Sequence, residues 1–123
     1  MILIVGDRPS PKMKPGARPF EGAGCEQRLK EWISFLVGHF DFFMAYHIVN
    51  STDEDFSESL EYAKEKRIPI VALGNNASKA LGDLPHFKLP HPSGRNRQIN
   101  DALFIKMKLS ECQDWLKANQ RKP

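Results

Sequence analysis

The chain begins with MILIVGD, residues 1–7, and this stretch decides the fold class. Met1 to Val5 is a continuous run of mostly branched apolar residues, and Gly6 stops it. An uninterrupted apolar run of this length is typical of a strand that is buried on both faces, as in a parallel sheet. We therefore expect a sheet that helices cover on both sides.

Three more short apolar segments follow, separated by stretches with helical periodicity. We expect strands over residues 42–49, 68–73 and 86–89. We expect helices over residues 25–40 and 96–119. Another helix should begin with Ser51 or Thr52 as its N-cap and have an acidic first turn at 53–55. A short helix should run from Asn75 or Asn76 as its N-cap to Leu81. This alternation predicts an α/β fold with a doubly wound, four-stranded parallel sheet and helices on both faces.

The composition is that of a globular protein. The chain has 123 residues, of which 41% are hydrophobic and 27% charged, so we expect a single domain over residues 1–123. No apolar run is long enough to span a bilayer, and the run before Gly6 is too short for a signal peptide. We expect a soluble, intracellular monomer in the cytoplasm or at the nucleoid, without a membrane partner.

The cysteines and most of the histidines predict no metal site. Cys25 and Cys112 lie 87 positions apart, which suits two reduced thiols and lacks the paired spacing of a zinc site. His39, His47 and His86 lie within or beside apolar segments without metal-ligand spacing, so we interpret them as structural. We expect no metal and no cofactor.

The charges are unevenly distributed along the chain. Residues 1–20 carry a net charge of +3, residues 41–66 carry −5, and residues 88–123 carry +5. If the two basic segments meet in space, they form a basic face opposite an acidic one, which suits a polyanion such as nucleic acid. A solvated surface with basic ends explains the same charges equally well.

The segments that follow the expected strands carry polar groups. Gly6-Asp7, Asn50, Gly74-Asn75 and His91-Pro92-Ser93 come directly after the four strands. Ligands of doubly wound sheets bind beyond the carboxyl ends of the strands, so we expect a site at this edge. The loop over residues 8–24 contains four prolines and three glycines, and long loops in small domains are usually functional.

Four residues near this edge are candidates for the chemistry, and each has a plainer alternative. Asp7 can orient a water or stabilise a cation, or it can form a turn. His91, held between two prolines, can act in a site, or it can hydrogen-bond to the backbone of a turn. Phe20 can stack on a planar ligand or anchor its loop in the core. Asn50 can hydrogen-bond to the edge of a base or cap the following helix.

Two segments resemble a known family. GDRP at 6–9 followed by GARPFEGAG at 16–24 resembles the first motif of the uracil-DNA glycosylase superfamily, closest to its thermophile-type branch. LPHPSGRN at 89–96 resembles the second motif of that superfamily. The thermophile-type branch carries an iron–sulfur cluster on four cysteines, and this chain has two cysteines. The chain is also shorter than typical members and has Asp7 in place of a glutamate.

The resemblance implies a role for each candidate. Phe20 would stack on uracil, Asn50 would hydrogen-bond to its polar edge, Asp7 would position water and stabilise the sugar cation, and His91 would donate to the uracil oxygen. The residues that would contact DNA are Arg8, Lys12, Lys14, Arg18, Ser93, Arg95 and Asn96.

Three function classes remain open from the sequence. The first is a DNA glycosylase that flips out uracil or a related modified pyrimidine and hydrolyses its N-glycosidic bond. The second is a non-catalytic DNA-binding protein on the same fold. The third is an enzyme that acts on free nucleosides or nucleotides.

Overall fold

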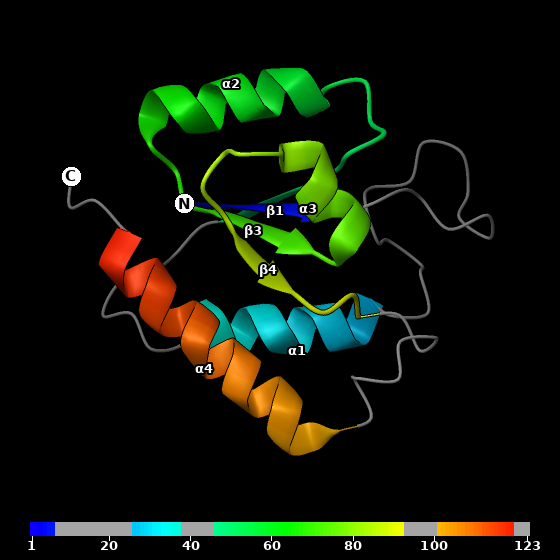
Figure 1. Cartoon of the computed structure of the whole chain (residues 1–123), viewed down its shortest axis with the longest axis vertical. Coiled ribbons are helices and arrows are strands. Elements are labelled where there is room, and N and C mark those ends of the chain that lie inside the picture. Colours follow the sequence, from blue (N-terminus) through cyan, green and yellow to red (C-terminus); the bar gives the residue numbers. More distant parts are fainter. Residues whose placement is uncertain (7–25, 38–45, 93–100, 120–123) are drawn as a thin grey trace.

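Four parallel strands form the centre of the molecule, in the order β2-β1-β3-β4 (Figure 1). The computed structural model describes residues 1–6, 26–37, 46–92 and 101–119. The strands are β1 (Ile2–Gly6), β2 (Tyr46–Asn50), β3 (Ile70–Leu73) and β4 (Phe87–Leu89). The helices are α1 (Glu26–Val37), α2 (Phe56–Lys66), α3 (Asn75–Leu81) and α4 (Ala102–Asn119).

Helices cover both faces of the sheet, which confirms the doubly wound α/β fold. Helices α1 and α4 lie on one side of the sheet and α2 and α3 on the other (Figure 1). Alternate residues of β1 serve the two sides: Ile2 and Ile4 pack with the α1 and α4 residues, and Leu3 and Val5 pack with the α2 and α3 residues. This arrangement explains why the first strand is apolar at every position.

The two sides are filled differently. The α1/α4 side holds large side chains, among them Trp32 and Leu116. The α2/α3 side holds the small side chains of Ala63, Ala72 and Ala77. Small residues let a helix backbone approach the sheet closely, whereas large ones interdigitate across a wider gap.

Helix α2 begins later than the sequence pattern predicts. Ser51 and Thr52 are not its N-cap, because residues 51–55 form turns and the N-cap is Asp55, which makes no side-chain capping bond. The Asp53 carboxylate accepts a hydrogen bond from the Asn50 N–H at 2.9 Å, and the Asp53 N–H donates to the Asn50 carbonyl at 3.0 Å. These two bonds close a tight turn directly after β2, so helix geometry starts only after it.

Other boundaries also differ from the prediction. Gly74, with a φ of 90°, is the N-cap of α3 in place of Asn75 or Asn76. Strand β3 starts at Ile70 because the Ile68 N–H still donates to the Ala63 carbonyl and closes the end of α2. Helix α4 starts at Ala102, and the Asp101 carboxylate accepts a hydrogen bond from the Phe104 N–H at 3.0 Å.

No helix within the described ranges is both long enough and apolar enough to cross a membrane.

Candidate functional site

The carboxyl ends of the strands meet at one edge of the sheet. Gly6 of β1 is level with Asn50 of β2, and Leu73 of β3 is level with Leu89 of β4. The Ser51 N–H donates to the Gly6 carbonyl at 2.8 Å and continues the ladder by one bond. The residues that follow the four strands therefore start from the same edge.

The chain crosses the sheet in opposite directions from β1 to β2 and from β3 to β4, so the direction reverses between β1 and β3. The connection from β1 passes through α1 on one side of the sheet, and the connection from β3 passes through α3 on the other side (Figure 1). Adjacent strands whose connections leave toward opposite faces open a crevice at their carboxyl ends. In this sheet the position lies between Gly6 and Gly74.

Asn50 is buried at this edge. Its exposed fraction is 1%, and its Oδ1 atom has no hydrogen-bond partner within the described parts of the chain. A buried carbonyl oxygen without a donor costs about 1–3 kcal/mol, so such atoms are rare and often belong to a ligand site. The alternative that Asn50 caps the next helix is wrong, because α2 begins six residues later at Phe56.

His91 is packed over Gly74. A Cβ atom on Gly74 would lie 3.1 Å from Cβ of His91 and 3.5 Å from its Cδ2. The Gly74 N–H donates to the Leu89 carbonyl at 2.8 Å, which holds the end of β3 against the start of the histidine loop. Glycine suits this position, since any side chain there would combine a strained positive φ with a tight contact to the histidine.

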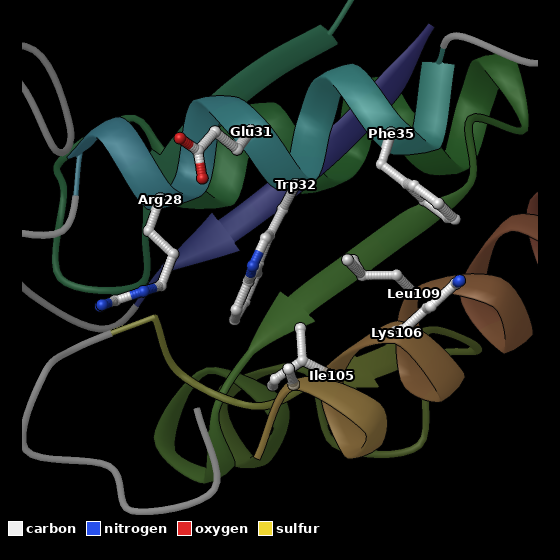
Figure 2. A pocket seen from close by; sticks show the side chains of 8 residues that line it. Arg28, Glu31, Trp32, Phe35, Ile105, Lys106 and Leu109 are labelled. Atoms are coloured by element: carbon white, nitrogen blue, oxygen red, sulfur yellow. The ribbon is translucent and has the colours of Figure 1, made fainter. Parts of the chain in front are cut away.

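The loop that carries His91 is also held from α1. Nη1 of Arg28 donates to the Pro92 carbonyl at 2.7 Å. Figure 2 shows the Arg28 side chain extending from α1 toward this loop. The two residues are 64 positions apart, and Arg28 looks like any polar residue between the apolar positions of α1, so no local pattern could have identified this contact.

Asn50 and His91 flank the end of β1. Asn50 ends β2, on one side of β1, and His91 packs on Gly74 at the end of β3, on the other side. The ends of β2 and β3 lie two strand spacings apart, about 10 Å between their backbones, with the end of β1 between them.

The remaining candidates lie outside the described residues. They are Asp7, Phe20, Arg8, Lys12, Lys14, Arg18, Ser93, Arg95 and Asn96. Asp7 follows Gly6 directly in the chain, and Ser93 follows Pro92. Their proposed roles stay predictions.

The described part of the molecule does not carry the positive charge of the chain. It contains ten basic and twelve acidic residues, a net charge of −2, whereas the whole chain carries +3. Helix α4, expected to belong to a basic segment, has three lysines and two acids and follows Asp101. The excess of basic residues is therefore concentrated in residues 7–25, 93–100 and 120–123 of the sequence.

The other histidines differ from one another. His86 is structural as predicted, because its Nδ1 donates to the Leu84 carbonyl at 2.6 Å and its Nε2 lies 2.7 Å from Oγ of Ser78. His47 is exposed on β2, and His39 lies outside the described residues.

Cys112 is a free thiol in the core, and burial raises its pKa to about 12. Cys25 lies outside the described residues. The part of the chain that the structure describes contains no group of three metal-ligating side chains.

Two grooves are present beside the helices of the described residues. One, of about 460 Å³, runs between α1 and α4, where Trp32 points toward Ile105 (Figure 2). The other, of about 540 Å³, lies between β2 and α2. Neither is lined by Asn50, Gly74 or His91.

No protein-family model, curated protein or solved structure matches this chain. The function is therefore inferred from the residues and their geometry.

Proposed function

We propose that the protein is a DNA glycosylase that removes uracil, or a related modified pyrimidine, from DNA. The observation that carries this proposal is the buried Oδ1 of Asn50, which has no partner among the described residues, at the same strand edge as a histidine packed on Gly74. The resemblance of residues 6–24 and 89–96 to the two motifs of the uracil-DNA glycosylase superfamily supports it.

The amide of Asn50 suits the polar edge of uracil. Its Oδ1 accepts a hydrogen bond, and uracil presents one N–H donor beside a carbonyl oxygen that its Nδ2 can serve. Pairing the buried Oδ1 with that N–H removes the cost of leaving it unpaired. A base in a duplex has to leave the stack to reach such a pocket, so the enzyme flips it out.

His91 and Asp7 act on the two charges that develop as the bond breaks. His91 donates a hydrogen bond to the oxygen of uracil as the base leaves with a negative charge. Asp7 stabilises the positive sugar and positions the water that attacks it. His91 is held in place by its packing on Gly74, by the two flanking prolines and by the bond from Arg28 to Pro92. Preorganised stabilisation requires such a fixed position.

The basic residues after β1 and β4 bind the DNA backbone. Residues 7–25 and 93–100 contain six of the basic side chains, and both segments start from the carboxyl edge. Phosphate contacts there would hold the duplex across the site while Phe20 stacks on the flipped base. An enzyme of this kind works on intracellular DNA, in the cytoplasm or at the nucleoid.

Single-turnover cleavage of an oligonucleotide that contains one uracil tests the proposal. We expect release of uracil by the wild-type protein and a loss of roughly 10²- to 10³-fold in rate for Asp7→Asn and for His91→Ala, with little change in DNA binding. His47→Ala is the matched control, because His47 is exposed on β2 away from the edge. Full activity of both site variants would exclude the assigned roles.

The same assay distinguishes the runner-up. A wild-type protein that binds DNA but releases no base from a panel of uracil and modified pyrimidines is a non-catalytic DNA-binding protein. The concentration of basic residues in the segments after β1 and β4 favours DNA binding in either case.

A further inference from the structure

The groove between β2 and α2 combines an apolar floor with exposed aromatic walls. Leu3 and Ala63 are buried beneath it, and Tyr46 and Tyr62 line it. Tyr46 is 45% exposed, Tyr62 is 50% exposed, and Met1 beside them is 50% exposed. These are three of the five large hydrophobic residues that are exposed in the described ranges, so their gathering at one groove marks an interaction surface.

One stripe of α2 adds negative charge to the groove. Asp55, Glu58 and Tyr62 follow one another at spacings of three and four residues, so they lie on one face of the helix, and all three line the groove. Neither carboxylate forms an ion pair with any residue that the structure describes, whereas Glu61 pairs with Lys64 at 3.4 Å. Met1 and His47 also line the groove, at the end formed by β1 and β2, so it is the α2 wall with its two carboxylates that is complementary to a positive charge.

We propose that this groove binds a lysine or arginine side chain of a basic peptide segment in a partner protein. The aliphatic stem would lie on Leu3 and Ala63, as long basic side chains do on apolar surface. The cationic head would lie against the faces of the tyrosines and the two carboxylates, which attract it by cation–π and charge-assisted contacts. A groove of about 540 Å³ has room for such a side chain with its flanking residues.

Nucleic acid does not suit this surface, because the carboxylates of Asp55 and Glu58 repel phosphate. Helix α2 also lies on the opposite side of the sheet from α1, whose Arg28 holds the His91 loop. Peptide binding at this groove does not depend on the proposed glycosylase activity.

The test is an NMR titration of the isotope-labelled full chain with a capped peptide of four arginines separated by glycines. We expect the amide signals of Glu58, Ser59 and Tyr62 to shift most. An equally long peptide with glutamates in place of arginines should cause no shift there. Spermidine, a free polyamine, should bind more weakly, since it lacks a peptide backbone and the planar guanidinium.

Two variants decide whether the groove or the overall charge is responsible. Asp55→Asn with Glu58→Gln should weaken arginine-peptide binding about five- to tenfold. The matched control, Glu54→Gln with Glu65→Gln, removes the same charge from exposed positions that do not line the groove, and it should weaken binding less than about twofold. Tyr62→Leu keeps an apolar side chain without the aromatic face and should weaken binding about threefold.

Equal weakening by the two double variants would overturn the proposal, because it would show attraction by net charge alone. Spermidine binding as tight as the peptide would also overturn it, since the site would then serve a free polyamine. Circular dichroism melting of each variant checks that α2 remains folded. If the Asp55/Glu58 double variant unfolds, the binding constant of the Tyr62→Leu variant tests the groove instead.

Discussion

Two buried amide side chains show how differently the core and the carboxyl edge are built. Gln113, in the core between the sheet, α1 and α4, donates from Nε2 to the Phe35 carbonyl at 3.1 Å and so ties α4 to the end of α1. Asn50, at the carboxyl edge, keeps its Oδ1 unpaired among the described residues. One amide donates the bond that joins two helices, and the other amide has an acceptor without a partner among the described residues.

The backbone shows the same difference. The edge contains Gly74 at a φ of 90° with His91 packed on it, whereas the core consists of regular strands and helices. Glycine adopts this φ without strain, whereas a larger residue there would be strained and would crowd His91. The carboxyl edge therefore depends on one glycine and a histidine packed on it, whereas the core depends on regular burial of apolar side chains.

The largest expected effect belongs to the core. Trp32 is 6% exposed and fills the space between α1, α4 and the sheet, so Trp32→Ala should lower the free energy of unfolding by about 3–5 kcal/mol. Leu103, which is 81% exposed on α4, is the matched control, and Leu103→Ala should change it by less than about 0.5 kcal/mol. Urea unfolding measures both, and equal losses would contradict a core on this side of the sheet.

The next effect tests strain at the edge. Gly74→Ala introduces a Cβ at a positive φ and 3.1 Å from His91, so it should cost about 1–3 kcal/mol and displace the histidine. Gly82→Ala is the control, because Gly82 also has a positive φ but nothing lies within 4 Å of its added Cβ. Urea unfolding gives the stability, and the NMR signals of the His91 ring should move only in the Gly74 variant. Unmoved signals would mean that the contact does not position His91.

A smaller effect comes from the core thiol. Burial raises the pKa of Cys112 from 9.0 to about 12 in the folded protein. The stability that the neutral buried thiol contributes is therefore fully present below pH 9 and is lost as the pH rises toward 12. Between pH 9 and pH 10 this loss amounts to about 1 kcal/mol. Urea unfolding at both pH values should show that the free energy of unfolding decreases by about 1 kcal/mol less in Cys112→Ala than in the wild-type protein. Identical decreases would show that the thiol titrates alike in both states.

The smallest effect on stability distinguishes the two amides. Asn50→Leu removes a buried acceptor that has no partner among the described residues and keeps a similar volume, so the free energy of unfolding should change by less than about 1 kcal/mol, toward higher stability. Gln113→Leu leaves the Phe35 carbonyl without its donor and should cost about 1 kcal/mol. Thermal or urea unfolding compares them. A large loss for Asn50→Leu would show that its amide holds the fold together.

The edge itself was predictable, but its contacts were not. The apolar run before Gly6 and the polar residues after each strand placed Asn50 and His91 at one edge, because parallel strands end on the same side of a sheet. The Arg28 bond to Pro92 joins α1 to a loop 64 positions away and carries no local pattern. The start of α2 was predicted wrongly because Asp53 turns back to the Asn50 backbone instead of entering a helix.

The sequence by itself determined the order of the strands and helices and the two-sided burial of β1, because apolar periodicity is a local property of the chain. Only the tertiary structure decided that Asn50 is buried with an oxygen that no described residue pairs, that His91 packs closely on Gly74, and that Tyr46 and Tyr62 line one groove. These features arise where segments distant in the chain pack together. Burial and hydrogen-bond pairing depend on that packing, and neighbouring residues in the sequence do not encode it.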